Sequence, residues 1–249
     1  MNNHNLPVAI IGGGPVGLSA AAHLKKSNQP FILFETGSQI GANILKWGHV
    51  KLFSPWEYNI DKAAEALLRE AKLPIPNKAD VPYGKEIIED YLKPLANLPG
   101  IKEHIHLNSK VIAIGRSGID KMKDAKRGEL PFSIQVNESG QFKLYEAKAV
   151  IDASGTWQSP NPVGSGGIFA LGEVDIRSQI YYGMPDINEA DEDKYANKTT
   201  LVVGGGHSAI GTILALNDLI HKYPNTKIHW VLRKRQVSDV YGGQEADKF

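Results

Sequence analysis

The sequence has 249 residues, and its 42% hydrophobic and 22% charged side chains are typical of a globular protein. The formal net charge of +1 supplies no field that would attract nucleic acid or an anionic membrane. No apolar run reaches the ~20 residues of a membrane span, and the first residues lack the basic and apolar regions of a signal peptide. We therefore expect a cytoplasmic protein of one or two domains. The absence of cysteine excludes structural disulfides, thiolate metal sites and a redox-active dithiol within the chain.

A glycine-rich turn near the N-terminus predicts a dinucleotide site. It follows the apolar run 8–11, which is typical of a buried parallel strand, and precedes an Ala-rich helix predicted over 16–27. The turn fits G-x-G-x-x-G, whose glycines permit a tight turn, the approach of a pyrophosphate and close helix–strand packing. The helix N-terminus adds unpaired N–H groups that suit phosphate. The candidate contacts are Gly12, Gly13, Gly14, Pro15, Val16 and Gly17.

An acid ends the next predicted strand, over 31–35. Short connections predict a β-α-β unit with parallel strands and a right-handed crossover. Glu35 follows the first glycine at about the ~20 residues expected of an acid that accepts from ribose hydroxyls, and Thr36 is its neighbour. The alternative is a glycine turn in an unrelated α/β protein. The strand, helix and acid around the turn disfavour that alternative.

The middle of the chain changes its pattern several times. We expect a loop over 41–58, a helix over 61–72 with Asp61 as its N-cap, and a second helical stretch over 85–92. Period-two patterns over 110–148 predict three strands, with a hairpin turn at 137–140, and 150–155 has a buried-strand pattern. Residues 156–198 are rich in Gly, Pro and Asp, which is typical of a connecting segment.

A second glycine turn lies between a strand predicted over 199–203 and a helix predicted over about 208–221. Gly204, Gly206 and Ala209 fit G-x-G-x-x-A, and His207 and Ser208 lie inside the turn. The following strand ends in a basic run and not in an acid. A base suits a 2′-phosphate, so this unit favours NADPH over NADH. The alternative is a solvated strand end, since charged strand exits are common. The candidate bases are Arg233 and Lys234.

Two such units resemble the two-dinucleotide-binding flavoprotein superfamily, whose members bind FAD in the first unit and NAD(P)H in the second. The strands over 110–148 resemble the β-meander of the FAD domain, and the resemblance implies an adenine contact by the backbone near Val111. The segment with Ala153, Ser154 and Gly155 resembles the stretch that closes that domain. The implied fold is α/β. It consists of a three-layer, Rossmann-like FAD-binding domain with a β-meander insert, and the start of a second Rossmann-like domain for NADPH.

Within this superfamily the chain is most similar to flavin-containing monooxygenases. GGGHSA, GTWQSPNP and WGHVKLFSPW each resemble a segment of that group. The resemblance implies an FAD-dependent oxidoreductase that takes hydride from NADPH and passes electrons to oxygen. Trp47, His49 and Trp56 are candidates for flavin or substrate contact, with core packing as the alternative.

One monooxygenase fingerprint, F-x-G-x-x-x-H-x-x-x-[YF], is not intact in the nearest segment, 171–183. This departure leaves two alternatives open. One is a flavin reductase or oxidase that serves another acceptor, and the other is a non-catalytic dinucleotide-binding fragment. Disulfide reductase chemistry is disfavoured because it needs a pair of thiols beside the flavin. We assign no catalytic residue, since the isoalloxazine ring carries the chemistry.

The chain is expected to contain an FAD-binding domain over 1–156, a connecting segment over 157–198 and an incomplete NAD(P)H-binding domain over 199–249. The last part has two predicted strands and one helix, whereas a dinucleotide-binding half-domain needs a third strand. We therefore expect the sequence to be a piece of a longer protein. The expected partners are oxygen or a small-molecule substrate. His104 and His106 alternate on a predicted strand, but we expect no metal site there.

Overall fold

The computed structural model describes residues 5–233. The chain divides into two compact units, Met1–Gly155 and Thr156–Phe249, and each is described by itself. Along residues 5–233, no helix has both the length and the apolar character needed to cross a membrane.

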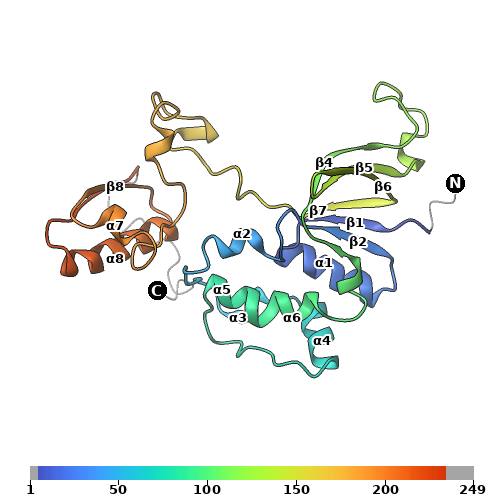
Figure 1. The fold of residues 1–249 in the computed structure, drawn as a ribbon, viewed down its shortest axis with the longest axis horizontal. Helices are drawn as coiled ribbons and strands as arrows, with labels where there is room; N and C mark the ends of the chain where they lie inside the picture. Colours follow the sequence, from blue (N-terminus) through green and yellow to red (C-terminus); the bar gives the residue numbers. More distant parts are fainter. Residues whose placement is uncertain (1–4, 234–249) are drawn as a thin grey trace. The chain divides into compact units, whose positions relative to one another are not determined.

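A four-stranded parallel sheet forms the centre of unit 1 (Figure 1). Its order is β3-β2-β1-β7. β1 pairs in parallel with β2 on one side and β7 on the other, so Val8 lies between Phe31 and Ala149. The strands are β1 (Val8–Ile11), β2 (Phe31–Phe34), β3 (Ile105–His106) and β7 (Ala149–Asp152). The predicted parallel β-α-β unit is confirmed.

Successive side chains of β1 and β2 enter different cores, because strand residues alternate between the two faces of a sheet. Ile10 and Leu33 pack with the helices, and Ala9 and Phe34 pack with the meander. Figure 1 shows α1 and α4 on one side of the sheet and β4, β5 and β6 on the other. The predicted three-layer α/β architecture is confirmed.

The helical layer contains more helix than the sequence indicates. Its elements are α1 (Pro15–Lys26), α2 (Ala42–Leu45), α3 (Trp56–Asn59), α4 (Lys62–Glu70), α5 (Gly84–Glu86), a π-helical stretch (Ile87–Leu92), α6 (Lys93–Ala96) and a 3-10 turn (Lys102–His104). Asp61 caps α4 as predicted, accepting from the N–H groups of Ala63 and Ala64. The expectation of loop over 41–58 is wrong at α2 and α3. The helix expected over 85–92 continues to Ala96 because Leu95 is fully buried.

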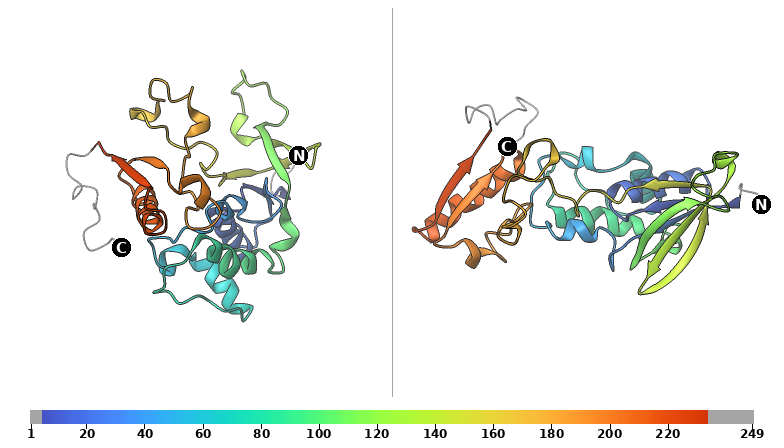
Figure 2. Two further views of the ribbon diagram at one scale, coloured as in Figure 1. Left: turned by 60° about the vertical axis from the view of Figure 1, so that its left-hand side comes forward. Right: turned by 90° about the horizontal axis from the view of Figure 1, so that it is seen from above.

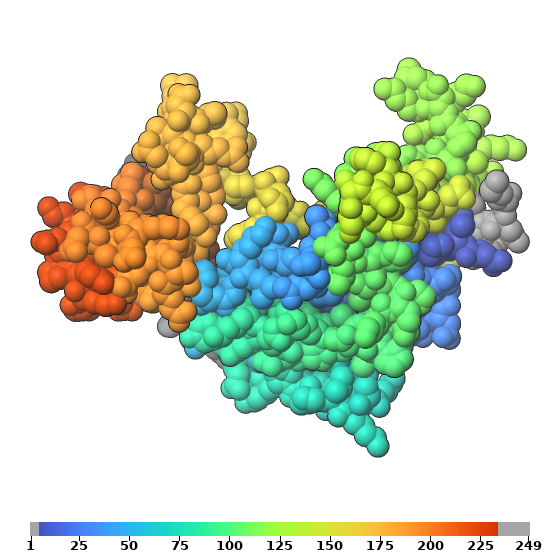
Figure 3. Space-filling model, viewed as in Figure 1, coloured from blue at the N-terminus to red at the C-terminus, as the bar shows by residue number. Residues whose placement is uncertain are grey.

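The meander is a three-stranded antiparallel sheet of β4 (Ser109–Arg116), β5 (Phe132–Glu138) and β6 (Gln141–Ala147), and Figure 2 shows its strands side by side. The predicted hairpin is confirmed: Ser139 and Gly140 have positive φ, and the Gly140 N–H donates to Oδ1 of Asn137 at 2.8 Å. The connection from β4 to β5, which contains a 3-10 turn (Arg127–Glu129), forms the green knob that projects from the meander in Figure 3.

Unit 2 contains a parallel pair of strands packed on one long helix. The elements are β8 (Thr199–Val203), α8 (His207–Lys222) and β9 (Lys227–Val231), preceded by α7 (Glu192–Tyr195) and 3-10 turns at Ser165–Gly167 and Arg177–Gln179. Val202 and Trp230 face a small core with Leu216 and Leu219 of α8. This is the strand–turn–helix–strand order that the second glycine motif predicts.

The segment before β8 is organised around one buried carboxylate. Glu173, which is 4% exposed, accepts from the N–H groups of Val163 and Ala170 and from the hydroxyl of Tyr182, at 2.7 to 2.9 Å. Burial alone would raise the pKa of Glu173, but the hydrogen bonds hold it below its usual value. One side chain thereby ties together three parts of a segment whose composition suggests only a linker.

Candidate functional site

At its first and last glycines, Gly12 and Gly17, the first glycine loop makes backbone contacts that leave no room for a side chain. Gly12 has φ +100°, and a Cβ there would lie 2.5 Å from the carbonyl oxygen of Ala153. A Cβ on Gly17 would lie 1.9 Å from the carbonyl oxygen of Gly12. The first glycine therefore serves the turn and the contact with the closing strand, and the last lets α1 pack against the turn.

The middle of the same loop is open. Gly14 is the N-cap of α1, and a Cβ built there meets no atom within 4 Å. Pro15 follows at the first turn of α1, which carries no acidic residue, and the Val16 side chain is 67% exposed. A helix N-terminus with free N–H groups, open space before it and no local negative charge can hold a phosphate group.

Glu35 lies at the end of β2 and holds the loop. It is 9% exposed, and its Oε2 accepts from the N–H of Gly13 at 2.6 Å. Its Oε1 accepts from the N–H of Gly37 at 2.7 Å. An ionised carboxylate has about four acceptor positions, so both oxygens can also accept from a ribose diol. The ribose contact of Glu35 stays a prediction, and sequence reasoning misses its contacts to the loop. Thr36, the next residue, is exposed.

Backbone hydrogen bonds fix the chain around Glu35. Its N–H donates to the carbonyl of His106, and its carbonyl accepts from the N–H of Ser109, each at 2.8 Å. Asn108, with φ +52°, donates its N–H to the carbonyl of Gly37 at 2.9 Å. β4, which carries Val111, therefore starts at the turn that Glu35 occupies.

Val111 lies at an irregularity of the meander. The register of β4 against β5 shifts between Val111 and Ala113, as in a β-bulge. A bulge leaves backbone groups outside the regular ladder, which suits a backbone contact to an adenine. That contact stays a prediction.

The closing strand ends beside the first loop. The N–H of Ala153 donates to the carbonyl of Ile11 at 2.9 Å. Ser154 donates its hydroxyl at 2.6 Å and its N–H at 3.1 Å to Oδ1 of Asp152. These hydrogen bonds lower the pKa of Asp152. Gly155, with φ +69°, is exposed.

The two predicted aromatic contacts of the 47–56 segment pack against protein. A Cβ on Gly84 would lie 2.8 Å from the ring of Trp47, which borders the helical core. Trp56 is 4% exposed and belongs to that core. His49 is half-buried. These positions favour the packing alternative for both tryptophans. Packing on one side leaves the flavin contact of Trp47 untested, so the contacts named for Trp47 and His49 stay predictions.

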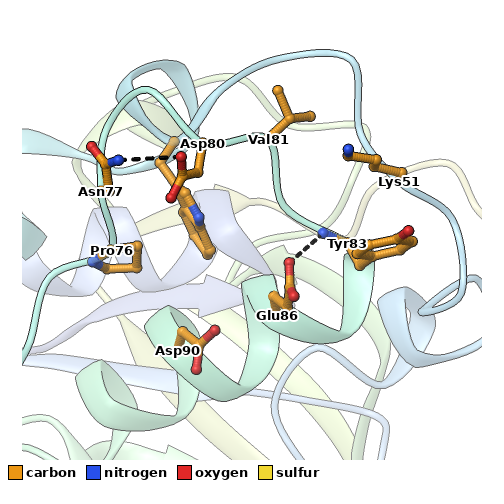
Figure 4. A pocket seen from close by; sticks show the side chains of 9 residues that line it. Lys51, Pro76, Asn77, Asp80, Val81, Tyr83, Glu86 and Asp90 are labelled. Carbon is orange, nitrogen blue, oxygen red and sulfur yellow. Dashed lines mark hydrogen bonds between the residues drawn. The ribbon is translucent and has the colours of Figure 1, made fainter.

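A cavity of about 350 Å³ lies in unit 1, outside the glycine loop (Figure 4). Its lining is Lys51, Trp56, Pro76, Asn77, Asp80, Val81, Tyr83, Glu86 and Asp90. Burial raises the pKa of Asp90, as do the charges of Glu86 and Glu89. Glu86 accepts from the N–H of Tyr83 at 2.7 Å and thereby caps α5. Glu86 therefore stabilises the start of α5 in addition to lining the cavity.

The predicted pair of histidines is not arranged as expected. His104 lies in a 3-10 turn with its ring tilted by 55° against the ring of Phe31, and only His106 of the two lies in β3. His106 Nδ1 lies 3.4 Å from Oε1 of Glu138. Among residues 5–233, no three His, Asp or Glu side chains are grouped so that they could hold a metal ion.

The second glycine loop resembles the first but is roomier. Gly204 has φ +128°, and a Cβ there would lie 3.9 Å from that of Ala209. Gly206 is the N-cap of α8 and has open space around the position of a Cβ. His207 and Ser208 form the first turn of α8, half-buried and exposed respectively. This loop has the same open approach to a helix N-terminus.

A tryptophan holds the second loop. Trp230 Nε1 donates to the carbonyl of Gly204 at 2.7 Å across 26 residues of sequence. Sequence reasoning misses this contact. The available signal was an aromatic with an N–H donor on the helix-facing side of β9, near the strand end. Arg233 lies just beyond β9 and is exposed, and Lys234 lies outside the described residues.

Both loops and the strands around them match one family. A family model described as pyridine nucleotide-disulphide oxidoreductase matches residues 9–240. The chain belongs to the pyridine nucleotide-disulphide oxidoreductase family. These 249 residues contain no cysteine, so a thiol pair is not among them.

Curated relatives in sequence are ferredoxin–NADP reductases. One from Rickettsia rickettsii is 28% identical over 88% of this chain and 51% of its own length. One from Streptococcus gordonii is 25% identical over 88% of this chain and 54% of its own length. The chain thus spans about half the length of the curated relatives it matches.

Solved structures share the fold. A bacillithiol disulfide reductase from Bacillus cereus has a TM-score of 0.59 at 17% identity, over 90% of this chain and 67% of its own. A flavin-containing monooxygenase from Stenotrophomonas maltophilia has a TM-score of 0.60 at 17% identity, over 90% and 57%. The predicted superfamily is confirmed, and both reductases and monooxygenases share its fold.

Proposed function

We propose that the chain is part of an oxidoreductase that holds FAD at the first loop and NADPH at the second. The observation that carries the proposal is the pair of open helix N-termini, each next to a glycine loop fixed by a side chain from the following strand. FAD supplies a flavin ring that accepts hydride from a reduced nicotinamide and passes the electrons on.

The residues of the first loop bind and orient. Gly14 leaves space for the pyrophosphate, and the N–H groups at the start of α1 donate to it. Glu35 accepts from the ribose hydroxyls while it keeps the loop in place. Val111 contacts adenine through its backbone, and the 153–155 segment borders the cofactor.

In the second loop, Gly206 leaves space for the phosphates of NADPH, and the N–H groups at the start of α8 donate to them. Arg233 and Lys234 pair with the 2′-phosphate, where an acid would repel it. No proton-transfer residue is assigned.

The curated relatives favour a reductase whose electrons leave to a separate acceptor, as the name ferredoxin–NADP reductase states for those proteins. The interrupted fingerprint in 171–183 points the same way. In the structure this segment is folded around Glu173. Transfer to oxygen, as in a monooxygenase, is the second candidate, and the similarity of the second loop to that group supports it.

The visible absorption spectrum of the purified chain with FAD tests the proposal. A bound flavin band that bleaches when NADPH is added without air supports both sites. Re-oxidation by air, compared with re-oxidation by an iron–sulfur protein under argon, separates the two acceptors. No flavin binding by the folded chain, or no bleaching by NADPH, would contradict the assignment.

A further inference from the structure

In each of the two glycine loops, one side chain makes a hydrogen bond to the loop backbone, and we call this side chain the clamp. The loop is the donor in one case and the acceptor in the other. In the first, an N–H of the loop donates to a charged side chain, from Gly13 to Glu35 at 2.6 Å. In the second, a carbonyl of the loop accepts from a neutral side chain, from Trp230 to Gly204 at 2.7 Å. Each clamp comes from the end of the strand that follows the loop's own helix.

The second clamp is anchored on both sides. Trp230 is half-buried and packs in the core between β9 and α8. The N–H of Gly204 donates to the carbonyl of Val231 at 3.1 Å, so both backbone groups of this glycine are tied to the end of β9. Gly204 has φ +128°, a conformation that starts the turn. The position of the loop therefore depends on the end of β9.

The choice of clamp has an electrostatic consequence. A carboxylate at this strand end would place a negative charge where a 2′-phosphate must sit, and like charges repel. A neutral indole fixes the loop without that charge, and the exposed side chain of Arg233 follows three residues later.

We propose that Trp230 is a positioning residue that takes over the loop-holding role of Glu35 and thereby allows the strand end to carry a base. This inference rests on the proposed function, since it assigns NADPH to the second loop. Trp230 then affects the affinity for both coenzymes, because it positions the loop that binds the pyrophosphate they share. Arg233 sets the preference for NADPH, because only NADPH carries the 2′-phosphate.

Three variants in unit 2 test the inference by calorimetric titration with NADPH, NADH and 2′,5′-ADP. Trp230→Phe removes the indole donor and keeps an aromatic ring, so it should weaken NADPH and NADH by the same factor, roughly three- to tenfold for one lost hydrogen bond. Arg233→Ala should weaken NADPH and 2′,5′-ADP and leave NADH unchanged. Trp157→Phe is the matched control, because Trp157 is a half-buried tryptophan of unit 2 that precedes β8 by about 40 residues; it should change the affinity for none of the three ligands.

Two results would overturn the role of Trp230. One is unchanged affinity for both coenzymes in a folded Trp230→Phe protein, and the other is a loss confined to NADPH, as expected for Arg233→Ala. If Trp230→Phe does not fold, hydrogen exchange of the indole N–H in the wild-type protein replaces it. Slow exchange that slows further with NADPH supports the clamp, and fast exchange refutes it.

Failure of the proposed function gives a different pattern. Wild-type protein that binds neither coenzyme, yet shows a slowly exchanging Trp230 indole, would keep the hydrogen bond but remove NADPH from the second loop and with it the role in affinity. Wild-type protein that binds NADPH, together with a folded Trp230→Phe protein whose affinity for both coenzymes is unchanged, would leave the coenzyme site in place. That result would remove only the role of Trp230.

Discussion

Replacing Gly17 by alanine should destabilise unit 1, because the added methyl group has no room in the first loop. The new Cβ would lie 1.9 Å from the carbonyl oxygen of Gly12, whereas ordinary contacts begin at 3.4 Å. The start of α1 and the carbonyl of Gly12 would have to separate by about 1.5 Å, and overpacking of this kind costs up to about 3 kcal/mol. For a unit of this size, that cost lowers Tm by about 6–12 °C.

Gly14→Ala is the matched control, because its methyl group meets no protein atom within 4 Å. It should change Tm by no more than about 4 °C, the cost of an N-cap change of about 1 kcal/mol. It should nevertheless weaken FAD binding, since the methyl group points into the space assigned to the pyrophosphate. Thermal unfolding without cofactor, followed by FAD titration, measures both effects. An unchanged Tm for Gly17→Ala would refute the packing argument, and wild-type FAD affinity in Gly14→Ala would refute the placement of the pyrophosphate.

Two further predictions concern the stability of unit 1. Asp61→Ala should lower the free energy of unfolding by about 1 kcal/mol at pH 7 because α4 loses its cap, whereas Lys62→Ala should change it little. The pKa of Asp61 is lowered, because the hydrogen bonds it accepts and its interaction with His23 outweigh burial, which alone would raise it. The difference between Asp61→Ala and wild type should therefore shrink as the pH falls below about 4; a difference that persists at pH 2 would contradict the capping role. Burial and the Glu138 carboxylate raise the pKa of Tyr145 to about 12. A raised pKa stabilises the folded state below pH 10, and this contribution is lost between pH 10 and 12. Tyr145→Phe should flatten that part of the stability curve in urea titrations. An unchanged slope would contradict a stabilising hydrogen bond from the Tyr145 hydroxyl to the Glu138 carboxylate.

The sequence predicts the features of this fold that depend on neighbouring residues. Apolar runs, glycine turns and the Asn137 hairpin each carry their information within a few positions, and the structure has all of them. The prediction failed over 41–58, where aromatic and apolar side chains fold short helical turns against the core. Composition alone suggested a loop because glycines and a proline are spread through the segment.

The contacts that hold the candidate site were harder to predict because they join distant positions. Trp230 reaches Gly204 across 26 residues, and nothing local to either residue requires the bond. The burial of Glu173 could not be predicted, because a buried carboxylate in a polar segment looks the same in sequence as a solvated one. The two loops themselves were predictable because backbone geometry demands glycine there.

The order of the parallel sheet sets the order in which unit 1 can be completed. β1 is synthesised first, yet it pairs with β7, whose residues lie about 140 positions later. Closing so long a loop costs conformational entropy, and the chain loses this entropy before the hydrogen bonds between β1 and β7 form. Until residues 149–152 have been synthesised, one edge of the central strand has no partner, and an apolar edge of this kind is open to pairing with other chains. Slow refolding and aggregation at high concentration should therefore arise at β1, and a chain cut before residue 149 should show both at their worst.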